Sequence, residues 1–111
     1  MLISVAVDYR HADVATRERF HLTEERLARL YGADPAGVMP ERVGLATCNR
    51  SEAYAWVPGA HAEALEPHFA ALARAWMGSD LAARQLLAVA KRRVGDAAVR
   101  HLFRVASGVE S

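Results

Sequence analysis

The order in which two hydrophobic periodicities follow each other along this chain is the feature that most constrains its fold. Apolar residues recur at every second position in segments 2–8, 42–48 and 52–57, which is the pattern of half-buried β-strands. Only residues 49–51 separate the last two segments. We therefore expect a β-hairpin with Cys48 at its bend.

Helical spacing fills the intervals between these strands, and residues suited to helix caps or stops mark the ends. The expected helices run from Asp13 to Phe20, from Thr23 to Gly32, from His61 to Met77 and from Asp96 to Gly108. Pro67 either lies in the first turn of the third helix or kinks it. A fourth strand is predicted at Gln85–Lys91, where the alanines make a helix the competing interpretation.

The resulting order is strand, helix, strand, strand, helix, strand, helix, with the first helical region split in two. This order matches the ferredoxin-like split βαβ arrangement. We predict an α+β domain with a four-stranded, mostly antiparallel sheet, helices on one face and a C-terminal helix in addition.

Composition narrows the classes of protein that this chain can represent. The 111 residues carry 14 Lys and Arg against 13 Asp and Glu, and one cysteine. That is the size of one compact domain without disulfides. No apolar run approaches the ~20 residues that span a bilayer, and no basic region precedes the first apolar stretch. We expect a cytoplasmic protein without a membrane partner. The formal net charge of +1 excludes a histone-like nucleic-acid binder but leaves room for a local basic patch.

One basic cluster stands out near the end of the chain, at Lys91, Arg92, Arg93, Arg100 and Arg104. It has little acid nearby and is suited to contact phosphates. A solvated strand end explains the same charges equally well. The histidines show no HxxxH spacing and the chain has no CxxC pair, so we assign no metal site.

Cys48 and His101 are the residues best suited to chemistry. A thiol on a bend beside the Arg50 guanidinium ionises more readily, because the positive charge favours the nucleophilic thiolate. The competing interpretation of Cys48 is a small buried hydrophobe. His101 can serve as a general acid or base, or simply be a core or surface histidine of the last helix.

Two separated stretches give the sequence a family resemblance. Residues 46–54 read ATCNRSEAY and residues 101–111 read HLFRVASGVES. Together they resemble the two signature stretches of the N-terminal catalytic domain of glutamyl-tRNA reductases, and residues 16–19 resemble that family's first helix. The chain departs from the family at Tyr9, where a histidine is usual, and at Glu110, where an aspartate is usual.

The resemblance implies a role for individual residues. Cys48 matches the nucleophile and His101 the histidine needed for activity, and the expected substrate contacts are Thr47, Asn49, Arg50 and Ser111. Residues 1–111 would be the catalytic, substrate-binding domain, truncated at its C-terminal end. The NADPH-binding and dimerisation domains of the family would lie outside this chain, which has no G-x-G-x-x-G turn.

The implied enzyme is an oxidoreductase that uses NADPH to reduce glutamyl-tRNA(Glu) to glutamate-1-semialdehyde through a Cys48 thioester. This is the first step toward 5-aminolevulinate and the tetrapyrroles, including porphyrins and haem. Family members homodimerise and hand their product to glutamate-1-semialdehyde aminotransferase. The alternative is a non-catalytic ferredoxin-like module that binds RNA or a partner. RNA-binding sheets of this topology usually carry an RNP-type aromatic run, which this sequence lacks.

Overall fold

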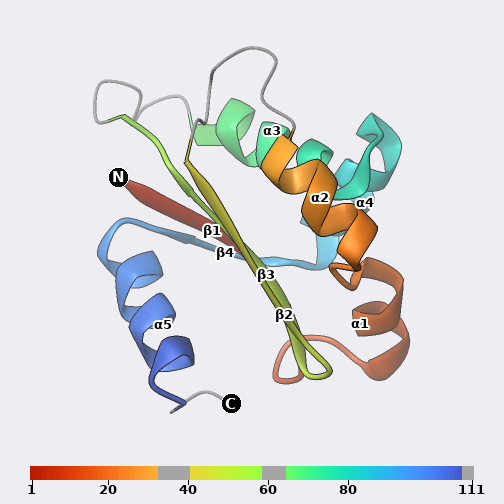
Figure 1. Cartoon of the computed structure of the whole chain (residues 1–111), viewed down its shortest axis with the longest axis horizontal. Helices are drawn as coiled ribbons and strands as arrows, with labels where there is room; N and C mark the ends of the chain where they lie inside the picture. Colours follow the sequence, from red (N-terminus) through yellow and green to blue (C-terminus); the bar gives the residue numbers. More distant parts are fainter. Residues whose placement is uncertain (33–40, 59–64, 109–111) are drawn as a thin grey trace.

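The computed structural model describes residues 1–32, 41–58 and 65–108 of the chain. Its elements follow in the order β1 (Leu2–Asp8), α1 (Val14–Phe20), α2 (Glu24–Gly32), β2 (Arg42–Thr47), β3 (Arg50–Trp56), α3 (Leu65–Met77), α4 (Asp80–Val89), β4 (Lys91–Val94) and α5 (Asp96–Ala106). Helices α1 to α4 lie on one side of the sheet, and α5 lies alone on the other side (Figure 1).

The four strands form one antiparallel sheet in the order β2-β3-β1-β4. Strands β1 and β2 run in the same direction with β3 inserted between them, which is the split βαβ arrangement. The predicted α+β fold is therefore confirmed. The register places Asp8 opposite Arg50, so the end of β1 and the start of β3 lie side by side at one end of the sheet.

Alternation along β1 separates an apolar face of the sheet from a polar face. Ile3, Val5 and Val7 point toward α1 to α4 and are buried with Leu72 and Trp76. The Trp76 indole donates a hydrogen bond of 2.9 Å to the carbonyl of Phe20, which joins α3 to the end of α1. This apolar layer is the hydrophobic core.

Gly44 on β2 allows α2 to approach the sheet closely. A Cβ atom at this position would lie 2.6 Å from Leu27 Cδ2 and 2.9 Å from Leu30 Cδ2, closer than carbon atoms pack. The absence of a side chain at Gly44 therefore sets the distance between α2 and the sheet.

The opposite face of the sheet is polar although α5 covers it. Buried on this side are Ser4, Asp8, Arg50 and Glu52, together with His101 from α5. Most buried polar groups are hydrogen-bonded to one another or paired by charge, and Ser4 Oγ is an exception among the described residues. The polar face is therefore the part of the fold in which functional residues are expected.

The predicted strand at Gln85–Lys91 is wrong for most of its length. Residues 85–89 belong to the helix α4, and only Lys91 lies in β4. The physical reason is a cap followed by alanine-rich sequence: Ser79 Oγ accepts a hydrogen bond of 3.2 Å from the Ala82 amide, and alanine has the highest helix propensity. The helical interpretation of the alanines prevails.

The other helix boundaries mostly follow the prediction. Asp13 Oδ1 accepts a hydrogen bond of 2.8 Å from the Thr16 amide, as a cap does. Pro67 lies in the first turn of α3, which decides between the two alternatives given for it. Asp96 is not a cap: it is the first residue of α5, and Gly95 precedes it with a φ of 62°, which favours glycine.

Residues 61–64, the start of the helix predicted from His61 to Met77, lie outside the described residues. Among the helices that are described, none has both the length and the apolar character needed to cross a membrane.

Candidate active site

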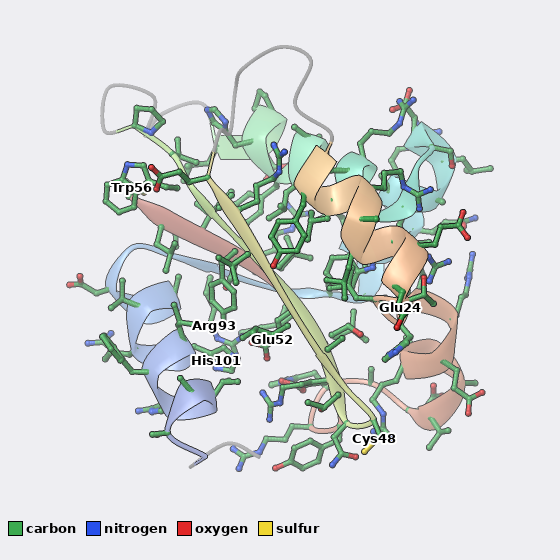
Figure 2. The ribbon with its side chains drawn as sticks, in the orientation of Figure 1. Glu24, Cys48, Glu52, Trp56, Arg93 and His101 are labelled. Carbon is green, nitrogen blue, oxygen red and sulfur yellow. The ribbon has the colours of Figure 1, made fainter. Side chains whose placement is uncertain are left out.

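The turn between β2 and β3 exposes Cys48 to solvent at one end of the sheet (Figure 2). Thr47 Oγ1 accepts a hydrogen bond of 3.3 Å from the Asn49 amide within this turn. The Asn49 carbonyl accepts a hydrogen bond of 3.0 Å from the Tyr9 amide, which ties the turn to the residue after β1. These contacts hold an exposed thiol on a fixed backbone, and the alternative of a buried structural cysteine is wrong.

A pocket of about 360 Å³ lies beside the Cys48 thiol. The hairpin contributes Thr47, Cys48 and Arg50 to its wall, and the region around α1 contributes Arg17 and His21 together with one acidic residue, Glu18. We call it the cysteine pocket. Its basic side chains can hold an anionic group near the thiol, because a guanidinium forms strong hydrogen bonds with carboxylates.

Behind the cysteine pocket, a buried network centres on Glu52, which has no exposed surface. Its Oε2 atom accepts a hydrogen bond of 2.9 Å from Arg50 Nη1. The same oxygen lies 2.9 Å from His101 Nε2. Its Oε1 atom accepts a hydrogen bond of 2.6 Å from the Tyr54 hydroxyl. Desolvation and the bond to Glu52 raise the pKa of Tyr54 well above its usual range. The network fixes the guanidinium of Arg50, a residue that lines the cysteine pocket.

Asp8 ends β1 next to this network. Desolvation acts to raise its pKa, but the hydrogen bond and charge of His11, the Arg10 amide and the charge of Arg50 outweigh that effect. The pKa of Asp8 therefore lies below its usual value. Asp8 Oδ1 lies 2.7 Å from His11 Nδ1 and accepts a bond of 3.1 Å from the Arg10 amide.

Ligand atoms of Asp8, Glu52 and His101 lie within 4.8 Å of one another. Such a group can in general hold a metal ion. Here, however, Glu52 already pairs with the Arg50 guanidinium and Asp8 with His11. These partners compensate the two carboxylates without a cation, so the geometry is that of a hydrogen-bonded network.

The structure brings together four of the six predicted site residues. Thr47, Cys48, Asn49 and Arg50 share the hairpin turn. His101 lines a different pocket, and within the described residues no hydrogen bond joins it to Cys48; Arg50 and Glu52 connect the two. Ser111 lies outside the described residues.

Sequence reasoning missed the central position of Glu52 and the contributions of Tyr54 and Asp8. A signal was present in the spacing: Arg50, Glu52 and Tyr54 occupy alternate positions of one strand, so they share one face. Polar residues at every second position of a strand with alanines between them indicate a polar face that another element covers.

The fold and site define an α+β domain that holds a solvent-exposed cysteine at a hairpin turn, backed by a buried arginine–glutamate–histidine network. The family described as "Glutamyl-tRNAGlu reductase, N-terminal domain" matches residues 5–111, and this chain belongs to that family.

Individual relatives agree with this assignment. The chain is 35% identical over 112 residues to the glutamyl-tRNA reductase of Geobacillus kaustophilus, covering 99% of this chain and 24% of that protein. Glutamyl-tRNA reductase of Staphylococcus aureus is also 35% identical, covering 98% and 24%. The structure of glutamyl-tRNA reductase from Methanopyrus kandleri superposes with a TM-score of 0.62 at 30% identity, covering 99% of this chain and 23% of that one. The chain thus spans about a quarter of the length of these relatives.

Proposed function

We propose that this chain is the part of a glutamyl-tRNA reductase that accepts the glutamyl group, with Cys48 as the nucleophile. The observation that carries the proposal is the position of the thiol: the only cysteine of the chain is exposed on a rigid turn beside a basic pocket. The names of the relatives supply the substrate, glutamate esterified to tRNA(Glu).

The acyl transfer follows from the chemistry of an activated ester. The Cys48 thiolate attacks the ester carbonyl carbon, a carbon–sulfur bond forms, and the carbon–oxygen bond to the terminal ribose breaks. The ribose oxygen takes up a proton from solvent and leaves as a hydroxyl group of the tRNA. The thioester keeps the acyl group activated for the next step.

Arg50 is the residue proposed to bind the side-chain carboxylate of the glutamyl group. A guanidinium offers parallel N–H donors to two carboxylate oxygens, whereas the amide of glutamine cannot accept two charge-assisted bonds. Glu52 holds Arg50 from behind at 2.9 Å, so the orientation of the guanidinium is fixed before substrate arrives. Binding to a pre-oriented group avoids the cost of ordering it.

His101 fits a positioning role better than direct proton transfer to the leaving hydroxyl. Its side chain is buried and its Nε2 atom lies 2.9 Å from Glu52. The chain of contacts from His101 through Glu52 to Arg50 leads to the cysteine pocket. We propose that His101 orients the glutamyl group through these two residues.

NADPH supplies the hydride in the reaction of the whole enzyme, and the described residues do not fit it. A dinucleotide needs a glycine-rich turn from a strand into a helix. The described strand-to-helix connections are residues 9–13, which contain no glycine, and Gly95 alone. We derive no step of the mechanism through NADPH.

The test is covalent trapping of labelled glutamate. The chain is incubated with labelled glutamyl-tRNA(Glu), quenched in acid, digested with ribonuclease and assayed for protein-bound label. We expect label on the parent and none on Cys48→Ser, because a serine hydroxyl stays protonated at neutral pH. The double variant C48S/S107C is the matched control, since it moves the thiol to an exposed position at the end of α5. Label on Cys48→Ser equal to the parent refutes the assignment, as does equal label on the control.

The alternative of a non-catalytic module that binds RNA through its sheet has less support. Helix α5 covers the sheet face on which Tyr54 lies, and the Tyr54 side chain is buried and bonded to Glu52. It cannot stack on a base as an RNP aromatic does. Rapid alkylation by iodoacetamide below the pH at which an ordinary thiol reacts would further separate a catalytic Cys48 from an unreactive one.

A further inference from the structure

A second pocket, of about 580 Å³, lies between α5 and the end of β1. Its basic side chains are Arg10 from the turn after β1, Arg93 from β4, and Arg100 and Arg104 from α5. Among the described residues of its wall, Asp8 is the only acidic one, and Asp8 is already bonded to His11. With histidines neutral, four arginines against one aspartate leave the wall with a formal charge of +3. We call it the arginine pocket.

The predicted basic cluster is split by the structure, and only part of it reaches this pocket. Arg92 points to the other face of the sheet, where it pairs with Glu66 at 2.7 Å. Arg93 is the next residue of the strand, so it points toward α5. Arg93 lies close to His101 and Glu52 between the sheet and α5 (Figure 2).

Three of these four arginines offer guanidinium donors without a partner among the described residues; the fourth, Arg10, donates a hydrogen bond of 3.1 Å from Nε to the Tyr9 hydroxyl. Arg93 Nη1 is buried and has no hydrogen-bond partner among the described residues. Within the same residues, the side chains of Arg100 and Arg104 make no ion pair or hydrogen bond. A buried charged donor without a partner is costly, and a native protein keeps one where a ligand satisfies it.

We propose that the arginine pocket binds the phosphate backbone of the tRNA whose glutamyl group Cys48 accepts. The inference rests on the proposed function and adds the surface that holds the RNA. Arg100 and Arg104 lie one helical turn apart, a rise of about 6 Å along α5. This places two guanidinium groups along a line, as successive phosphates of an extended strand require, whereas a single small anion needs them to converge.

The arginine pocket also lies next to the cysteine pocket. Asp8 in its wall is opposite Arg50 in the sheet register, and Arg50 lines the cysteine pocket. Tyr9 bonds to Asn49 in the Cys48 turn, and its neighbour Arg10 lines the arginine pocket. An RNA end that delivers its ester to Cys48 therefore has basic groups beside it for the preceding phosphates.

The test is the salt dependence of binding, with uncharged tRNA(Glu) as the probe. The affinity of the parent is compared with that of R100Q/R104Q by fluorescence anisotropy between 0.05 and 0.5 M salt, a range of roughly one decade. Both side chains are exposed, so the double variant should fold; circular dichroism checks this. Arg84→Gln is the matched control, because Arg84 is an exposed arginine on α4, on the opposite side of the sheet.

We expect the slope of log affinity against log salt to become shallower by about 1.4 for the double variant, or 0.7 for each lost single-strand phosphate contact. If both proteins bind equally at 1 M salt, this difference in slope corresponds to roughly 25-fold weaker binding of the RNA by the double variant at 0.1 M salt. Arg84→Gln should keep the slope of the parent.

Three results overturn the proposal: no binding of the RNA by the parent, an unchanged slope for R100Q/R104Q, or an equal change for Arg84→Gln. A competition experiment gives a further test. If millimolar inorganic phosphate displaces the RNA as effectively as an RNA competitor does, the proposal is overturned, because the pocket would then be a single-anion site. The binding readout does not use Cys48 chemistry. Loss of the trapped thioester with RNA binding retained refutes the proposed acyl transfer and leaves the arginine pocket standing.

Discussion

Replacing Arg50 by methionine should destabilise the domain by about 3–5 kcal/mol, because it leaves Glu52 as a buried charge without its cation. The side chains of Arg50 and Glu52 expose 3% and 0% of their surface, and the pair is joined at 2.9 Å. Methionine has a similar length, so the loss of packing is small beside the loss of charge compensation. Neither of the two remaining contacts of Glu52, with Tyr54 and His101, has the permanent charge of a guanidinium.

A second substitution tests whether the charge is the cause. In R50M/E52Q the residue at position 52 is neutral but can still accept the hydrogen bond from Tyr54. We expect the double variant to regain roughly 2 kcal/mol relative to Arg50→Met, the size of coupling found between residues in direct contact. The exposed pair of Arg74 and Asp80 is the control, with side chains 52% and 76% exposed. Although its contact is shorter, at 2.6 Å, Arg74→Met should cost only about 0–1 kcal/mol.

The measurement is equilibrium unfolding in urea at pH 7, followed by the fluorescence of the two tryptophans, of which Trp76 is fully buried in the core and Trp56 is half exposed. The m-values must agree between variants for the free energies of unfolding to be compared. Equal stability of Arg50→Met and R50M/E52Q would refute the argument, since it would show that no unpaired charge is left at Glu52. A cost for Arg50→Met no larger than that for Arg74→Met would refute it as well.

Four further outcomes follow from particular contacts. Arg50→Lys should reduce discrimination between glutamyl and glutaminyl esters in the trapping assay, because lysine keeps the charge but loses the planar fork; unchanged discrimination would exclude Arg50 as the specificity residue. Gly44→Ala should cost about 1–3 kcal/mol in urea unfolding, since the added Cβ overlaps two leucines of α2. The pKa of Asp8 lies below the ordinary 3.8, so its carboxylate stabilises the fold above that pH and the contribution is lost as pH falls through the lowered value; the stability gap between parent and Asp8→Asn should shrink below about pH 4. Mixed with glutamyl-tRNA and NADPH, the chain should release free glutamate slowly through Cys48 and form no aldehyde, as judged by chromatography of the products.

The strands and the hairpin could be predicted because their signal is local. Alternation in residues 2–8 and 42–57 depends on which side of the sheet each residue faces, and the sheet was correctly anticipated. The error at Gln85–Lys91 has a local cause too: a short apolar run with alanines fits a buried strand and a helix equally. Only the cap at Ser79 and the pairing of β4 with β1 distinguish them, and the second is a tertiary contact.

The candidate site was predictable in part for the same reason. The residues of the hairpin turn are neighbours in sequence, so naming Cys48 placed Thr47, Asn49 and Arg50 around it. The relation of His101 to that turn depends on where α5 docks, which no local pattern contains. The part of His101 in the chemistry at Cys48 therefore stays a prediction, to which the structure adds the contact of His101 with Glu52.

Arg50 connects the two pockets through its contact with Glu52. Arg50 lines the cysteine pocket and pairs with Glu52. Glu52 also contacts His101, which lines the arginine pocket. Because Glu52 is fully buried and contacts both residues, a shift of α5 that moves His101 would alter the hydrogen bonding of the carboxylate that holds the guanidinium. RNA bound to Arg100 and Arg104 would contact α5, the helix that carries His101. The geometry thus joins the proposed RNA surface to the guanidinium proposed to bind the glutamyl carboxylate, through two contacts of 2.9 Å on a single carboxylate oxygen.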